Sequence, residues 1–110
     1  MDNLEIRELK LTDLPAVLEI ERESFPCPWS QLTFLKELNN SLALYLVGLV
    51  EGEIVAYIGS WLLETQIHIT TLATKFAYRN KGFATQILRE LLERAKELEI
   101  PKASLEVRIS

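Results

Sequence analysis

Apolar residues recur along this chain with two different spacings, and each change of spacing marks a new element. Apolar residues spaced three and four positions apart appear after residue 12, after Ser30 and, most clearly, from residue 83 to 98. Alternating or continuous β-rich runs fill residues 4–10, 42–50, 53–63, 67–74 and 102–110. The pattern predicts the order strand, two helices, three strands, helix and strand.

The links between these runs predict how the strands pair. Glu51-Gly52 is a typical two-residue hairpin, and Thr65-Gln66 makes a second tight link, so three strands form an antiparallel meander. Gly59, inside the middle strand, predicts a bulge or a close approach of another group. The long helix should return the last strand parallel to the third of these strands. We expect an α/β fold with a mixed, mostly antiparallel sheet and helices on both faces.

The first predicted helix follows Thr12 or Asp13, either of which can cap it, and tolerates Pro15 in its first turn. Leu14, Val17 and Leu18 form its apolar stripe. The charged residues between them are predicted to face solvent: Glu19, Glu21, Arg22 and Glu23.

A proline-rich loop, Phe25-Pro26-Cys27-Pro28-Trp29-Ser30, separates the first two helices. Its two prolines prevent the helix from continuing, and Ser30 is a good N-cap for a second helix that carries Leu32, Leu35 and Leu38. Trp29 and Phe34 have the spacing of a hydrophobic staple. The loop is either the rim of a peptide-binding groove, with Phe25, Pro26 and Trp29 as substrate contacts, or a packed connection. The sequence favours neither.

Composition limits the possible classes of protein. A chain of 110 residues, 48% hydrophobic and 25% charged, fits a single globular domain spanning residues 1–110. The net charge of −4 argues against nucleic acid as a partner. One cysteine, Cys27, cannot form an internal disulfide. With no signal-peptide pattern and no apolar run of membrane length, we expect a cytoplasmic protein that does not contact membrane.

Between the third meander strand and the long helix lies a short basic loop, Arg79-Asn80-Lys81-Gly82. The N-terminus of a helix offers free N–H groups and a partial positive charge, and glycine lets the backbone approach a ligand closely. A basic loop before a helix therefore predicts a phosphate-binding site. The pattern alone does not identify the phosphate.

Residues Arg79-Asn80-Lys81-Gly82-Phe83-Ala84 fit the Arg/Gln-x-x-Gly-x-Gly/Ala signature of the GNAT acetyltransferases, and the whole chain resembles that family. Four stretches further resemble its RimI-like branch, which acetylates the N-terminal alanine of a small-subunit ribosomal protein: the early helix with Ile20-Glu21, Phe25 to Ser30, His68 to Ala73 and Leu105-Glu106-Val107-Arg108. The resemblance implies acetyl-CoA as cosubstrate, and nothing in the sequence resembles a metal site. It implies that backbone groups at Leu72, Ala73 and Thr74 hold pantetheine, and that a second set holds pyrophosphate: Arg79, Asn80, Lys81, Gly82, Phe83, Ala84 and Thr85.

The same resemblance assigns the chemistry. An α-amino group has a pKa of about 7.7–8.0, so a general base helps to deprotonate it before it attacks a thioester. By resemblance Glu106 is that base. His68, the only histidine, is either a proton relay or a strand-end histidine with a local hydrogen bond. Cys27 is expected to be a loop residue, because direct transfer needs no covalent enzyme intermediate.

Members of this branch continue for several tens of residues beyond the position of Ser110, and that segment carries their general acid. We therefore expect a domain that is short at its C-terminus, with an exposed sheet edge, weak or absent activity, marginal stability or dimerisation. Two other functions stay open. One is acetylation of a small-molecule amine, and the other is a catalytically silent acyl-CoA-binding domain.

Overall fold

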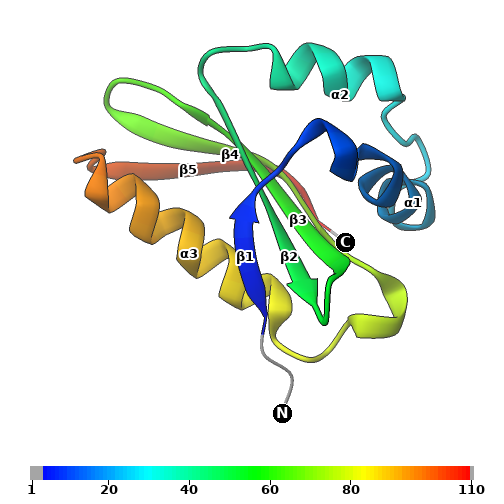
Figure 1. Cartoon of the computed structure of the whole chain (residues 1–110). Coiled ribbons are helices and arrows are strands. Elements are labelled where there is room, and N and C mark those ends of the chain that lie inside the picture. Colours follow the sequence, from blue (N-terminus) through cyan, green and yellow to red (C-terminus); the bar gives the residue numbers. More distant parts are fainter. Residues whose placement is uncertain (1–3, 110) are drawn as a thin grey trace.

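A five-stranded sheet with strands in chain order forms the centre of the molecule (Figure 1). The structure is a computed structural model that describes residues 4–109, without the side chains of 105–107. Strands β1 (Glu5–Glu8), β2 (Ala43–Val50), β3 (Glu53–Leu62) and β4 (Gln66–Thr74) pair antiparallel, and β5 (Lys102–Ile109) lies parallel to β4. The predicted mixed, mostly antiparallel sheet is confirmed.

Helices cover both faces of the sheet, as predicted (Figure 1). Helices α1 (Leu14–Ser24) and α2 (Gln31–Leu38) pack on one face, and α3 (Phe83–Glu97) packs on the other. Side chains in β2 alternate between the two sides, so that Tyr45 and Val47 face α1 and α2 while Leu46 faces α3. The sheet therefore has a buried apolar layer on each side. None of the helices within residues 4–109 is long and apolar enough to cross a membrane.

The turn between β2 and β3 has the geometry that its sequence predicts. Glu51 has a φ of 50° and Gly52 a φ of 83°, so both central residues are left-handed. Two left-handed residues characterise the type I′ turn, whose twist matches that of the strands it joins. In the second predicted link, the N–H of Leu63 donates to the carbonyl of Gln66 at 2.8 Å.

Gly59 satisfies both of the alternatives expected for it. The pairing of β3 with β4 shifts register between Gly59 and Ser60, which is a bulge. Gly59 also lies directly opposite Tyr45 on β2, where an added Cβ would stand 2.4 Å from Cε2 of the Tyr45 ring. A glycine is needed here because the tyrosine ring occupies the space of a side chain.

The start of α1 differs in detail from the prediction. Asp13 precedes the helix, but its carboxylate makes no capping bond to α1. It accepts instead from the backbone N–H of Lys10 at 2.7 Å and from both terminal nitrogens of Arg7 at 2.7 and 2.9 Å. A short 3-10 turn, η1 (Leu11–Asp13), brings these groups together. Asp13 therefore ties the first strand to the first helix.

The start of α2 agrees with the prediction. The Ser30 hydroxyl accepts from the N–H of Thr33 at 3.2 Å, which confirms the cap. The rings of Trp29 and Phe34 lie edge to face, 5.2 Å apart, which confirms the staple. Phe34 is the buried anchor of α2, whereas Leu32 and Leu35 are exposed.

Candidate active site

The predicted phosphate loop lies at the surface, at the N-terminus of α3. After β4 the chain makes a 3-10 turn, η2 (Phe76–Tyr78), and then passes through Arg79 to Gly82 before α3 begins. Asn80 and Gly82 have φ values of 63° and 81°, and no atom lies within 4 Å of an added Cβ at Gly82. The left-handed backbone, not crowding, is what favours glycine at this position.

The loop has the properties that an anion site needs. The side chains of Asn80, Lys81 and Thr85 are exposed, while Phe83 is buried and anchors the helix. Gly82 is the N-cap and provides no side-chain capping bond to α3. The first N–H groups of this 15-residue helix have no partner within the helix, so they are directed at the loop. The predicted pyrophosphate residues therefore surround the start of α3, where Asn80, Lys81, Gly82 and Thr85 are accessible and Phe83 is buried.

Arg79 braces this loop from within. Its Nε donates to the carbonyl of Thr74 at 3.0 Å, and a terminal nitrogen donates to the hydroxyl of Ser24 at 3.2 Å. The backbone N–H of Phe76 donates to the Glu23 carboxylate at 2.6 Å. The end of α1 and the loop after β4 are therefore held together, which fixes the loop against the sheet.

The predicted pantetheine residues, Leu72 to Thr74, have buried side chains. The Thr74 hydroxyl is buried and makes no hydrogen bond to any residue that the structure describes. A buried polar atom without a partner is uncommon in proteins, so it is consistent with a place where a ligand completes the site.

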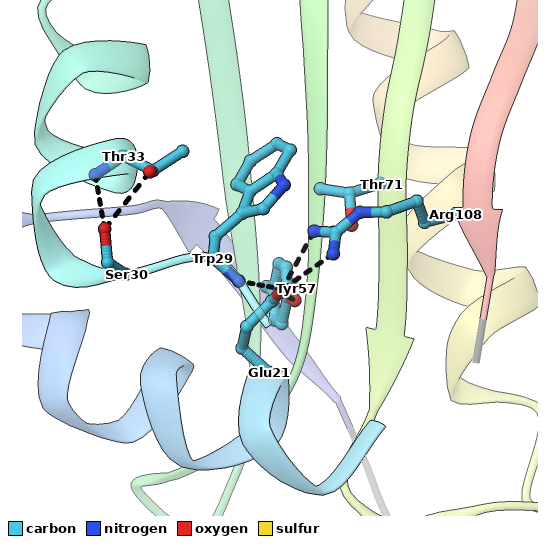
Figure 2. A network of polar contacts seen from close by, with 7 residues as sticks. All are labelled: Glu21, Trp29, Ser30, Thr33, Tyr57, Thr71 and Arg108. Carbon is cyan, nitrogen blue, oxygen red and sulfur yellow. Dashed lines mark hydrogen bonds and ion pairs between the residues drawn. The ribbon is translucent and has the colours of Figure 1, made fainter. Parts of the chain in front are cut away.

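A carboxylate on α1, that of Glu21, lies at the centre of a network of polar contacts (Figure 2). Glu21, predicted to face solvent, is 0% exposed. It accepts from the backbone N–H of Trp29 at 2.8 Å and from the hydroxyl of Tyr57. Arg108, on β5, reaches across β4 and donates to both Glu21 oxygens, at 2.7 and 3.1 Å. The prediction that Glu21 faces solvent was wrong. It grouped Glu21 with the other charged residues of α1, and the sequence near α1 does not show that Arg108 on β5 pairs with it.

Two aromatic rings enclose the Arg108 guanidinium. Its central carbon lies 4.1 Å from the centre of the Phe25 ring and 4.2 Å from the centre of the Trp29 ring. Guanidinium groups stack favourably on aromatic faces. The two aromatic residues predicted to contact substrate therefore each turn a face towards Arg108, and the loop between α1 and α2 is fastened to β5.

Tyr57 completes the network from β3. Burial, followed by the hydrogen bond to Glu21, raises the pKa of the Tyr57 hydroxyl well above its usual range. The phenol therefore stays protonated and remains a donor to the carboxylate. Thr71, on β4, accepts from Arg108 at 3.3 Å. The loop, α1 and three adjacent strands meet at Glu21.

The two predicted catalytic residues lie on adjacent strands. The side chain of Glu106 is outside the described residues, so its role stays a prediction. The backbone register sets Leu105 opposite Ile69 and Arg108 opposite Thr71, with an irregularity between these pairs. His68 Nδ1 lies 2.9 Å from the hydroxyl of Ser104 on the neighbouring strand β5. A part for His68 in proton transfer also stays a prediction.

Glu21 and Arg108 both lie in stretches that carry the family resemblance, but the sequence analysis predicted no site role for either, although one signal was present. Glu21 follows Val17 by four residues and Leu18 by three, so it lies on the apolar stripe of α1. A carboxylate on the buried face of a helix requires a partner. That spacing could have identified Glu21 as buried, but not that its partner is 87 residues away.

Comparisons with known proteins agree with this architecture. Residues 14–110 match the family model described as the acetyltransferase (GNAT) family. A Bacillus subtilis (strain 168) protein named "Putative ribosomal protein bS18-alanine N-acetyltransferase" is 37% identical over 106 residues, which cover 96% of this chain and 70% of that protein.

Two solved structures have the same fold. The ribosomal-protein-S18-alanine N-acetyltransferase of Escherichia coli superposes with a TM-score of 0.88 at 24% identity, over 96% of this chain and 68% of that one. The PaiA N-acetyltransferase of Thermoplasma acidophilum, solved with coenzyme A, gives 0.78 at 19% identity, over 94% and 78%. By its sequence and its fold, the chain belongs to the acetyltransferase (GNAT) family.

Proposed function

We propose that this protein transfers the acetyl group of acetyl-CoA to the N-terminal α-amine of a protein, most specifically to the N-terminal alanine of a small-subunit ribosomal protein in the cytoplasm. The observation that carries the proposal is the 37% identity, over nearly the whole chain, to the relative named for that reaction. The resemblance of Leu105 to Arg108 to the same branch supports it.

Acetyl-CoA supplies the acetyl group as an activated thioester. Its pyrophosphate would be held by the exposed loop from Arg79 to Thr85, through backbone N–H groups at the start of α3 and the charge of Lys81. Its pantetheine arm would lie along the backbone of Leu72 to Thr74. The left-handed Gly82, the absence of a side-chain cap on α3 and the unpaired Thr74 hydroxyl fit this placement.

The acceptor amine must lose a proton before it can attack. In this proposal the Glu106 carboxylate accepts that proton, directly or through a water molecule. The neutral amine then attacks the thioester carbonyl carbon, so that a C–N bond forms and the C–S bond breaks. The nitrogen loses a second proton as the amide forms, and the CoA thiolate takes up a proton and leaves as its thiol. No bond forms between the acetyl group and the protein.

The test is mass spectrometry of a synthetic peptide that begins Ala-Arg, incubated with acetyl-CoA and the protein. We expect a slow gain of one acetyl group on the α-amine, in line with the weak activity expected from the sequence. Replacing Glu106→Gln should lower kcat by about a hundredfold, the usual scale for loss of a general base. Binding of acetyl-CoA, measured by calorimetry, should be unchanged.

Glu97→Gln is the matched control, because Glu97 is an exposed carboxylate at the far end of α3. This variant should keep the parent rate. Acetylation of a small-molecule amine, with the peptide left unmodified, would contradict the proposed acceptor. Acetyl-CoA binding without product in either the parent or Glu106→Gln would instead indicate a silent binding domain.

A further inference from the structure

The pair formed by Glu21 and Arg108 joins two parts of the site that are distant in the sequence. Glu21 belongs to α1, and its carboxylate holds the backbone N–H of Trp29 in the loop that follows (Figure 2). Arg108 belongs to β5, two residues after the proposed base Glu106. One ion pair therefore links the loop between α1 and α2 to the strand on which the base would stand.

The geometry of this link is restrictive. Both Glu21 oxygens accept from Arg108, which is a bidentate contact that fixes orientation as well as distance. The guanidinium is also clamped between Phe25 and Trp29, with both ring centres within 4.2 Å. A lysine would keep the charge but would lose both the second hydrogen bond and the planar stacking.

A purely structural role explains this arrangement less well. A buried ion pair is often no more stabilising than apolar side chains of the same volume. Glu21 is fully buried, yet it carries a partner from the backbone of the proposed acceptor loop and another from the strand of the proposed base. What the pair does specify is the position of these two segments relative to one another.

We propose that Arg108, acting through Glu21, Phe25 and Trp29, is a positioning residue that sets where the acceptor's N-terminus lies relative to Glu106. This inference rests on the proposed function. In the proposed function, the loop from Phe25 to Ser30 contacts the acceptor, and the loop from Arg79 to Gly82 before α3 binds acetyl-CoA. Loss of the clamp should therefore affect the use of peptide and leave acetyl-CoA binding intact.

The experiment compares Arg108→Lys with the parent in a Trp61→Phe background, where Trp29 is the only tryptophan. Acrylamide quenching of Trp29 fluorescence reports on the loop directly. We expect quenching to increase, the KM for the Ala-Arg peptide to rise about tenfold, and the Kd for acetyl-CoA to stay within about twofold, since small misplacements of substrate have large effects on rate. Glu21→Gln should change the peptide kinetics in the same direction.

Arg94→Lys is the matched control. Arg94 makes a 3.0 Å ion pair with Glu90 on the surface of α3, so the same substitution there should change none of the three measurements. A parent without peptide turnover would reject the proposed function and this role with it. Turnover in the parent, with peptide kinetics unaltered in Arg108→Lys, would reject only the positioning role. An equal loss of peptide use and acetyl-CoA affinity would show a general disturbance and would also overturn it.

Discussion

Gly59 and Tyr45 lie directly opposite one another on β3 and β2, and the tyrosine ring covers the glycine. The ring is 3% exposed, and its hydroxyl donates to the Glu37 carboxylate at 2.8 Å. Because the ring is held at both ends, it cannot swing aside without breaking that hydrogen bond. The pair therefore ties α2 to the centre of the sheet.

Gly59→Ala should lower the free energy of unfolding by about 1–3 kcal/mol, the usual effect of overpacking a core. Gly48→Ala is the control, because the three atoms nearest to an added Cβ there belong to the flexible Leu4 side chain, at 3.0–3.2 Å. Its effect should be the smaller of the two. Urea unfolding followed by circular dichroism measures both, and equal losses would contradict the crowding by Tyr45.

Individual residues also show what local sequence can predict. The cap at Ser30, the staple of Trp29 on Phe34 and the left-handed turn at Gly52 depend on neighbours within five residues, and all three predictions are confirmed. Glu21 depends on Arg108, 87 residues away. No periodicity carries information about such a partner, so the network at Glu21 became visible only once the strands were placed.

At the scale of elements, β1 and α1 are joined through one carboxylate. The Asp13 side chain is 7% exposed and receives two hydrogen bonds from Arg7 and one from the N–H of Lys10. The hydrogen bond from Arg7 is the main cause that lowers the pKa of Asp13 below its ordinary value of 3.8, against the opposing effect of burial. The stabilisation that this junction gives to the fold should therefore decrease at acid pH.

Because the pKa of Asp13 is lower in the folded protein than in the unfolded one, its ionised form stabilises the fold. That contribution is complete above the unfolded value near 3.8 and is lost as the pH falls through the lower, folded value. Asp13→Asn should lower the free energy of unfolding by about 1–3 kcal/mol at pH 7, as expected for loss of a charged hydrogen-bonded partner. Its deficit should shrink below about pH 4.

Melting temperatures of the parent and Asp13→Asn at pH 7, 5 and 3 test this junction. A deficit that stays constant down to pH 3 would contradict the role of ionisation. Glu90→Gln serves as the control, because Glu90 pairs with Arg94 on the surface and is 40% exposed in its side chain. Surface pairs contribute little, so this variant should follow the parent at every pH.

Elements themselves were predicted more reliably than the contacts between them. The order of strands and helices, the hairpin at Glu51 and the parallel return of β5 follow from spacing and from link length. The turns η1 and η2 were not predicted, because each is short and is held by side chains from elsewhere. Arg7 holds the first turn through its bond to Asp13. Glu23 holds the second by accepting from the N–H of Phe76, and no sequence pattern links these two distant residues.

At the scale of the whole molecule, the net charge of the chain is negative, whereas the residues around the proposed anion site are basic. The chain has a net charge of −4, yet the proposed pyrophosphate loop lies beside Lys75, Arg79 and Lys81. Lys75 is paired with Glu53 at 2.8 Å, and Arg79 is directed towards Thr74 and Ser24. Lys81 is exposed beside the start of α3. Attraction of an anion to this surface should therefore depend strongly on Lys81.

Lys81→Glu should weaken acetyl-CoA binding by about tenfold at low salt, because it reverses a charge beside the helix N-terminus. The difference from the parent should narrow as salt increases, since exposed charges are screened. Lys96→Glu makes the same change at the C-terminal end of the same helix, where Lys96 is exposed, so overall charge is matched and only location differs. Calorimetric titration of acetyl-CoA into the parent, Lys81→Glu and Lys96→Glu separates the effect of net charge from the effect of a charge beside the loop. Equal weakening in both variants would mean that net charge governs binding, and the loop before α3 would lose its assigned part in holding pyrophosphate.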